Sequence, residues 1–357
     1  MKNVFFTLCF LIVQIIANSQ DSISRQIAVL QRDIENLKFS NEMLTKSLDD
    51  VLWFDKLKDV AVIDKVFLTS LPPTNIPNPT AQGAKNPLRF FAYVFIPANI
   101  DHKKKYPLLI LPHDGIHGNF RSIYTHVVRE LVAQGYIIAA PEYRGSSGYG
   151  KGFNEQIDYG GAEVDDVDST RAYMLENYDF IDKNRVGILG WSHGAYITLF
   201  SIFRNPEAYK VAFAGVPVTD LVARMGYKND AYRQLFSANY HLKKTAFDNV
   251  EEYRKRSPVW HAAKLKTPLL IHTNTNDEDV NVLEVEHLIQ ALKAEGKKFE
   301  YEIYKDIPGG HFFDRMDTKK AKEIRIKIYD YLAKYLHPEK TIKNVEELNR
   351  ISYYPSK

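Results

Sequence analysis

The chain has 357 residues, of which 45% are hydrophobic and 25% charged, and its formal net charge is +3. This is ordinary globular composition, and its mixed charges exclude a strongly basic surface, so we expect no nucleic-acid partner. Cys9 is the only cysteine and lies in an apolar run near the N-terminus. The rest of the chain therefore excludes disulfides, thiolate metal sites and a cysteine nucleophile.

Residues 1–19 have the pattern of a secretory signal peptide. Residues 4–16 are almost wholly apolar, and Ala17 and Ser19 provide the small residues that precede a cleavage site before Gln20. The apolar run is too short for a comfortable membrane span. We expect cleavage near Ser19–Gln20, a secreted or periplasmic location, and no membrane span in the mature chain. The alternative is an uncleaved N-terminal anchor.

Residues 20–57 are expected to form a heptad-repeat helix. Nine positions recur with 4,3 spacing, and eight of them are apolar: Ile23, Ile27, Leu30, Ile34, Leu37, Asn41, Leu44, Leu48 and Val51. β-Branched residues at a, leucine at d and the single Asn41 at a favour a parallel two-stranded coiled coil. We predict a homodimer through residues 23–51. The alternative is an amphipathic helix folded back on its own catalytic domain. In either case, we expect Trp53, Phe54 and Leu57 to dock the helix onto the globular body.

Residues 58–337 alternate short apolar strands with helices. This alternation predicts an α/β fold with a mostly parallel twisted sheet and helices on both faces. The long excursion at residues 221–262 is expected to form a rim or lid over a site. His113 and His117 lack a third metal ligand nearby, so we expect no metal, and no organic cofactor is needed. Residues 338–357 read as a polar C-terminal tail.

A serine at the end of an apolar run is the first candidate catalytic residue. Ser192 lies between Gly190 and Gly194 in a G-x-S-x-G pattern, with a strand expected before it and a helix after it. This arrangement is typical of the nucleophile elbow of α/β-hydrolases, where the serine occupies a strained turn. A side chain at either glycine would strike a neighbouring element.

Candidate partners for the serine follow two later strands. Asp277, Glu278 and Asp279 lie just after the strand at residues 268–272, where a carboxylate can hold a histidine Nδ1–H. His311 follows two glycines after the final strand, which is where a general base is expected. The order serine, acid, histidine is that of α/β-hydrolases. From the spacing alone, the three acids remain alternatives.

The chain resembles the catalytic domain of the prolyl oligopeptidase family over residues 60–337. The resemblance rests on five segments: Tyr143–Gly150, Gly160–Val167, Gly190–Tyr196, Ser257–Pro258 and the strand at Pro268–His272. It implies a serine peptidase. The large β-propeller that gates many family members is not found in this sequence, and a heptad segment precedes the catalytic domain instead.

The resemblance implies roles for several residues. The acid loop of the family reads Asp-x-x-Val, and Asp277 and Val280 have that spacing, so Asp277 is the implied acid. Val280, Trp191 and Tyr196 would line the substrate pocket. The backbone N–H of His193 would be one oxyanion donor.

The second oxyanion donor remains open. Loop 113–115 offers either the backbone near Asp114 or the side chain of His113. We expect a secreted serine hydrolase, with Ser192 as the nucleophile, that acts on short peptides. The alternatives are a carboxylesterase acting on small or carbohydrate-linked esters and a non-catalytic, coiled-coil-tethered binding protein.

Overall fold

The computed structural model describes the backbone of residues 2–76 and 78–351, and the side chains of residues 20, 22–76 and 78–351. The side chains of the predicted signal peptide, residues 1–19, therefore lie outside the described part. None of the helices that the structure describes is long and apolar enough to cross a membrane.

The globular body that follows residue 57 is built on one sheet of eight strands in the order β1-β2-β4-β3-β5-β6-β7-β8. β1 and β2 pair antiparallel, as do β2 and β4, and all the remaining pairs are parallel. The strands are β1 (Ala61–Ser70), β2 (Leu88–Pro97), β3 (Tyr106–Ile110), β4 (Ile137–Pro141), β5 (Ile181–Trp191), β6 (Val211–Gly215), β7 (Leu269–Asn274) and β8 (Glu300–Tyr304). The predicted α/β fold with a mostly parallel sheet is confirmed.

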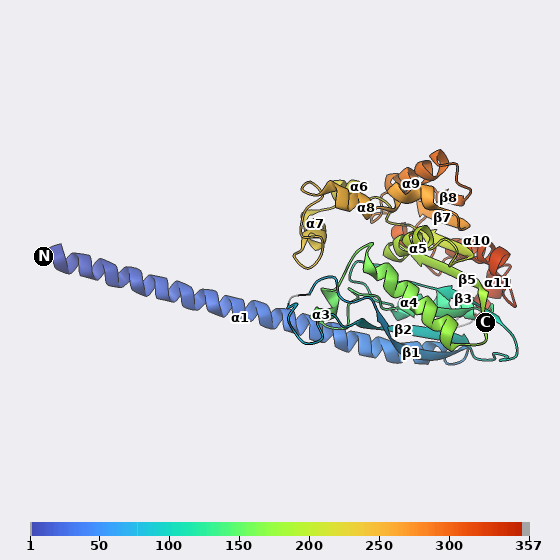
Figure 1. Cartoon of the computed structure of the whole chain (residues 1–357), viewed down its shortest axis with the longest axis horizontal. Coiled ribbons are helices and arrows are strands. Elements are labelled where there is room, and N and C mark those ends of the chain that lie inside the picture. Colours follow the sequence, from blue (N-terminus) through green and yellow to red (C-terminus); the bar gives the residue numbers. More distant parts are fainter. Residues whose placement is uncertain (1, 77, 352–357) are drawn as a thin grey trace.

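Helices cover both faces of the sheet (Figure 1). One face carries α4 (Ala162–Asn177), α5 (His193–Arg204) and α9 (Val282–Ala294), whose apolar side chains form one core cluster with the strands. The other face carries α2 (Thr125–Val132) and α10 (Lys319–Leu336), which share a second cluster. Successive side chains of β5 pack into the two clusters in turn, since Ile188 belongs to the first and Leu189 to the second.

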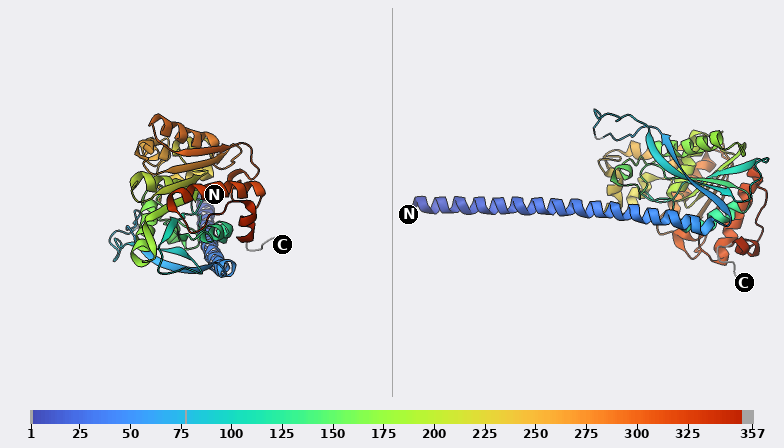
Figure 2. Two further views of the ribbon diagram at one scale, coloured as in Figure 1. Left: turned by 90° about the vertical axis from the view of Figure 1, so that its right-hand side faces the viewer. Right: turned by 90° about the horizontal axis from the view of Figure 1, so that it is seen from below.

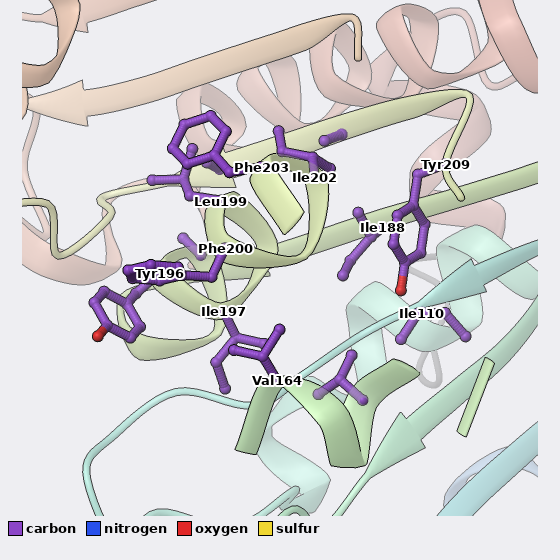
Figure 3. Packing of buried hydrophobic residues seen from close by; sticks show 14 of the residues in the cluster. Ile110, Val164, Ile188, Tyr196, Ile197, Leu199, Phe200, Ile202, Phe203 and Tyr209 are labelled. Carbon is purple, nitrogen blue, oxygen red and sulfur yellow. The ribbon is translucent and has the colours of Figure 1, made fainter. Parts of the chain in front are cut away.

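Helix α5, which begins directly after Ser192, is buried along its whole length up to Phe203. Tyr196, Ile197 and Phe200 pack in the same apolar cluster as Val164 of α4 and Ile188 of β5, as Figure 3 shows. A helix enclosed on all sides needs apolar residues all round, which explains its run of isoleucine, leucine and phenylalanine. This packing fixes the start of α5, and with it the position of the serine.

Helix α1 (Lys2–Leu57) is one continuous helix whose C-terminal half lies along the body, while its N-terminal part extends well beyond it (Figures 1 and 2). Trp53 and Leu57 are fully buried, and the Trp53 ring stacks on Phe120 with centroids 5.0 Å apart. The expectation for these two residues is confirmed. The expectation for Phe54 is wrong, since this side chain is 50% exposed.

The heptad positions of α1 do not make the contact with the body. The eight apolar side chains at these positions are 49–69% exposed, and Asn41 is exposed as well. Instead, a different face docks: Glu35 pairs with Lys151, Lys46 with Glu142, and Asp50 with Lys65. The helix therefore lies on its own catalytic domain, as the alternative reading proposed, but its apolar heptad face remains uncovered.

Two other regions differ from expectation. Residues 221–262 contain short helices in place of irregular chain: α6 (Leu221–Tyr227), α7 (Asp230–Ser237) and α8 (Val250–Lys255), with a 3-10 segment from Pro258. The expected polar tail contains α11 (Val345–Ile351), whose Leu348 is 2% exposed in the second core cluster. α11 was missed because a single buried leucine among polar residues gives little periodic signal.

The remaining short helix of the body is α3 (Lys151–Asn154).

Candidate active site

The serine of the G-x-S-x-G pattern lies at a sharp turn between β5 and α5. Ser192 has φ 54° and ψ −121°, a conformation that is costly for a residue with a side chain. Its backbone is held by two hydrogen bonds: its N–H donates to Gly215 O at 2.9 Å, and its carbonyl accepts from Tyr196 N at 3.0 Å. The turn places the serine above the carboxyl ends of the parallel strands, where ligands bind in open α/β sheets.

The glycines on either side of Ser192 are required by close backbone approach. A Cβ at Gly190 would lie 2.4 Å from the carbonyl carbon of Gly194. A Cβ at Gly194 would lie 2.2 Å from Pro112 O and 2.8 Å from His113 O. The start of α5 and the loop after β3 are therefore in direct contact, which is possible only without side chains at these two positions.

His311 lies on a 3-10 turn after β8 and is contacted by all three acids of the loop after β7. The Asp277 carboxylate lies 2.8 and 3.0 Å from Nδ1, and Glu278 Oε2 accepts from the backbone N–H of His311 at 3.0 Å. Asp279 Oδ2 lies 3.8 Å from Nε2. The backbone N–H groups of Asp279 and Val280 both donate to Asp277 Oδ1 at 2.8 Å. Asp277 is thus oriented toward Nδ1 by its own loop.

Ser192 and His311 are both 5% exposed. Among the hydrogen bonds of the described residues, none joins the Ser192 hydroxyl to the imidazole of His311, whose Nε2 faces Asp279 instead. Catalytic hydrogen bonds of this kind are often long before substrate binds and tighten in the complex. The structure therefore brings Asp277 and His311 into contact, and it places Ser192 after β5, at the same carboxyl edge of the sheet but separated from β7 by β6.

Asp279 is held by two cations from α6 and the residue that follows it. Arg224 Nη2 lies 3.3 Å from Asp279 Oδ2, and the Lys228 ammonium pairs with Oδ1. Burial opposes ionisation of Asp279, but the charge of Arg224 and the hydrogen bond from Lys228 outweigh it and hold the pKa of this carboxyl below its usual range. Asp279 is therefore an ionised carboxylate beside His311.

His193 is the first residue of α5, and its side chain is buried against another acid. Nε2 lies 3.0 Å from Glu163 Oε1, and the ring stacks on Tyr159 with centroids 4.1 Å apart. Glu163 also accepts from Gly160 N at 2.7 Å. This fixes the imidazole away from the serine, so what His193 can offer a substrate is its backbone N–H at the helix N-terminus.

The loop after β3 is anchored from both sides. The imidazole of His113 stacks on Tyr143 with centroids 4.1 Å apart, and its Nε2 lies 2.8 Å from Ser146 Oγ. Burial lowers the pKa of His113 to about 4, although the charge of Glu142 acts in the opposite direction. The guanidinium of Arg315 donates both to Asp114 Oδ2 and to the carbonyl of His311, which ties the loop to the histidine turn.

The predicted pocket residues Trp191, Tyr196 and Val280 all lie in the apolar interior, each at most 1% exposed. Trp191 points to the second core cluster, and its Nε1–H donates to Asp314 Oδ2 at 2.7 Å. The Tyr196 hydroxyl donates to Arg256 O at 2.7 Å. A pocket role for these three side chains stays a prediction.

Several residues of the site were missed by sequence reasoning: Lys46, Glu142, Glu163, Arg224 and Arg315. Glu163 lies in the Gly160–Val167 segment that carries the family resemblance, which could have singled it out. Arg315 is four residues after His311, but nothing in that spacing marks its contacts. Among the described residues, no cluster of three or more His, Cys, Asp or Glu side chains could hold a metal ion.

Comparison with known proteins bears on this geometry. The model of the prolyl oligopeptidase family matches residues 122–339. An "Uncharacterized peptidase YuxL" of Bacillus subtilis (strain 168) is 29% identical over 226 residues, which are 63% of this chain and 34% of that protein. Dipeptidyl peptidase 8 of Homo sapiens is 27% identical over 225 residues, which are 60% of this chain and 24% of the relative. The chain thus spans about a third or less of the length of these relatives.

Solved structures show the same fold. Porphyromonas gingivalis dipeptidyl peptidase 4 aligns with a TM-score of 0.58 at 23% identity, covering 78% of this chain and 35% of that chain. Pyrococcus horikoshii acylaminoacyl peptidase aligns with a TM-score of 0.63 at 20% identity, covering 84% and 45%. At such low identity these structures are evidence for the fold alone. The family match itself covers more than half of the sequence, and on that ground the chain belongs to the prolyl oligopeptidase family of serine-type peptidases.

Proposed function

We propose that the chain cleaves short peptides through an acyl-enzyme intermediate on Ser192. The observation that carries this proposal is the carboxylate of Asp277, which lies on Nδ1 of His311 and leaves the proton transfer to Nε2, 3.8 Å from the carboxylate of Asp279. His311 would take the proton of the Ser192 hydroxyl as it attacks the carbonyl carbon, and would return that proton to the leaving amine. Water then attacks the acyl group by the same route. Asp277 stabilises the imidazolium that forms in each step.

The tetrahedral intermediate needs donors for its oxyanion. The backbone N–H of His193 is available for this role because it is the first helical residue of α5 and lies next to Ser192. Loop 113–115 approaches the same helix start, as its contact with Gly194 shows, so we assign the second donor to the backbone of this loop. The side chain of His113 is a poorer candidate, since its ring is buried against Tyr143 and Ser146.

A fluorophosphonate probe tests the nucleophile. Wild-type protein should become covalently labelled, Ser192→Ala should not, and the matched control Ser201→Ala should label like wild type because Ser201 lies two and a half turns further along α5. Mass spectrometry of the labelled peptide should place the adduct on Ser192. Failure of the wild type to label would contradict the serine-hydrolase mechanism.

A substrate screen tests the peptide preference. Relatives named as dipeptidyl peptidase and acylamino-acid-releasing enzyme support peptides, free or blocked at the N-terminus, as the class to try first. We expect wild type, and not Ser192→Ala, to release the chromophore from short peptide substrates. Turnover of p-nitrophenyl acetate without turnover of any peptide would assign the chain as an esterase instead.

We further propose that two copies of the chain associate through α1. The eight exposed apolar side chains of the heptad face lie opposite the face that docks on the body, so a second copy can cover them without displacing the first contact. In a parallel, in-register pair Asn41 meets Asn41 of the second copy, and Asp33 at g lies near Lys38 at e of the other helix, with opposite charge.

Export is the last part of the proposed function. Residues 1–19 carry the pattern of a signal peptide, and we propose that the mature enzyme begins at Gln20 outside the cytoplasm. N-terminal sequencing of the protein recovered from periplasm or medium of an expressing bacterium tests this. An intact Met1 on membrane-associated protein would instead assign this segment as an anchor.

A further inference from the structure

Lys46 is an unusual lysine because it is 3% exposed, although it belongs to a helix that lies outside the family match. Its ammonium lies 2.6 Å from Glu142 Oε1 and 4.7 Å from the centroid of Tyr93, and it donates to the carbonyl of Phe120. Its position in the heptad is f, where a lysine normally points to solvent. Here it enters the catalytic body instead.

Glu142, the partner of Lys46, is even more buried. Glu142 directly follows β4 and is fully buried. Its two oxygens accept from the backbone N–H of Phe120 at 3.2 Å, and Oε2 lies 3.6 Å from Nε2 of His113. Glu142 therefore lies between the long helix on one side and the loop after β3 on the other.

His113 connects Glu142 to the backbone beside the nucleophile. Its ring is held between Tyr143 and Ser146, and its own carbonyl accepts from the Tyr143 hydroxyl at 2.9 Å. The same carbonyl is one of the atoms that would collide with a side chain at Gly194. The Tyr143 hydroxyl also lies 3.1 Å from Nδ1 of the His113 ring, so it links the ring to the backbone that faces the start of α5.

We infer that Lys46 is a positioning residue, which neutralises Glu142 so that His113 and the oxyanion loop keep the geometry that catalysis needs. The physical reason is the cost of a buried carboxylate without a counter-charge. Without Lys46, the nearest group that can compensate Glu142 is the imidazole of His113. That ring would take up a proton and turn toward Glu142, away from Ser146. α1 would in this way act on catalysis without touching the substrate.

This inference rests on the proposed function, and its effect should fall on the transition state. In the proposed function the backbone of loop 113–115 donates to the oxyanion, which forms only in the transition state, so displacement of this loop should lower kcat and leave KM unchanged. A purely structural role for Lys46 would lower the amount of folded enzyme without this separation between kcat and KM.

The test compares three variants of the full chain with wild type on one peptide substrate. Lys46→Met should lower kcat at least tenfold, with KM within about twofold of wild type. The double variant Lys46→Met/Glu142→Gln removes both charges, so no buried carboxylate is left for His113 to neutralise. Its kcat should therefore return to within about threefold of wild type. The control Glu35→Gln breaks another contact between α1 and the body, with Lys151, and should leave kcat unchanged.

Two results would overturn the inference. One is a folded Lys46→Met variant with wild-type kcat, and the other is a folded double variant as slow as the single one. If Lys46→Met alone fails to fold, the double variant still decides, because the inference requires it to be folded and active. Labelling of wild-type Ser192 by the fluorophosphonate probe separates these outcomes from a failure of the proposed function itself.

Discussion

The carboxylate of Asp279 lies 3.8 Å from Nε2 of His311, the nitrogen opposite the one that Asp277 contacts. The imidazole thus has an anion at each end. In the proposed reaction Nε2 must take the proton of the Ser192 hydroxyl, so the carboxylate of Asp279 competes with that hydroxyl for the same nitrogen.

Asp279→Asn should raise kcat/KM at least about twofold, because Nε2 of His311 then no longer faces a carboxylate and can turn to the hydroxyl of Ser192. The measurement is kcat/KM on one peptide substrate at a fixed pH. Asp306→Asn is a suitable control because Asp306 lies in the loop after β8 and bonds only to Thr275 among the described side chains. A kcat/KM below that of wild type in Asp279→Asn would contradict this account.

Gly194→Ala should lower kcat/KM on the order of a hundredfold, because the new Cβ would push the carbonyls of Pro112 and His113 away from the start of α5. Fluorophosphonate labelling should slow in parallel. The neighbouring substitution Ala195→Gly removes a methyl group and adds no contact, so it should affect activity far less. Equal rates for the two variants would show that the approach of the loop after β3 to α5 does not matter.

Trp53→Ala should destabilise the folded protein by about 3–5 kcal/mol, since it removes a fully buried indole that stacks on Phe120. The adjacent Phe54→Ala is a matched control: Phe54 is 50% exposed on the same helix and should cost less than about 1 kcal/mol. Urea unfolding followed by tryptophan fluorescence or circular dichroism gives both values. Similar losses for the two variants would argue against docking of α1 through Trp53.

Leu30→Asp should convert a dimer of residues 20–357 into a monomer in sedimentation experiments at micromolar concentration. Leu30 is a d residue, 60% exposed, and a carboxylate there would be buried between two helices. Val29→Asp introduces the same charge at the adjacent c position, which is 44% exposed and faces away from a partner helix, so this variant should remain dimeric. A monomeric wild type would refute the proposed association.

The stability of the protein should fall as the pH drops from about 6.5 toward 4, in part because of His272. Burial lowers the pKa of His272 to about 4, so between these values the unfolded chain binds a proton that the folded chain does not. The contribution is fully present above pH 6.5 and is lost as the pH falls, by up to about 1.4 kcal/mol per pH unit. His272→Leu should flatten this slope, whereas His102→Leu, at an exposed position, should not.

The arrangement of the sheet and the placement of Ser192, Asp277 and His311 after β5, β7 and β8 could be anticipated because both depend on chain order and strand alternation. The separate contacts of Glu278 and Asp279 with His311 could not, since side-chain directions in a three-residue loop depend on its backbone conformation. The pocket role of Trp191 stays a prediction; strand alternation along β5 places its side chain in the second core cluster.

The docking of α1 shows a different limit of sequence reasoning. Its heptad pattern predicts an apolar face for association. The face that docks on the body is a different one, which is polar and includes Glu35, Lys46 and Asp50. These charged residues look like solvent-facing positions of a coiled coil. Only the folded body supplies their partners Lys151, Glu142 and Lys65, which are distant in the sequence.

The unbroken course of α1 has a mechanical consequence. At 1.5 Å per residue, the stretch from residue 22 to residue 34, whose residues are all exposed, is about 20 Å long. Because α1 continues without a break to Trp53, whatever holds this stretch also fixes the distance and the direction of the catalytic body. If two copies pair through α1 as proposed, one continuous helix and not a flexible linker joins the paired segment to each globular body.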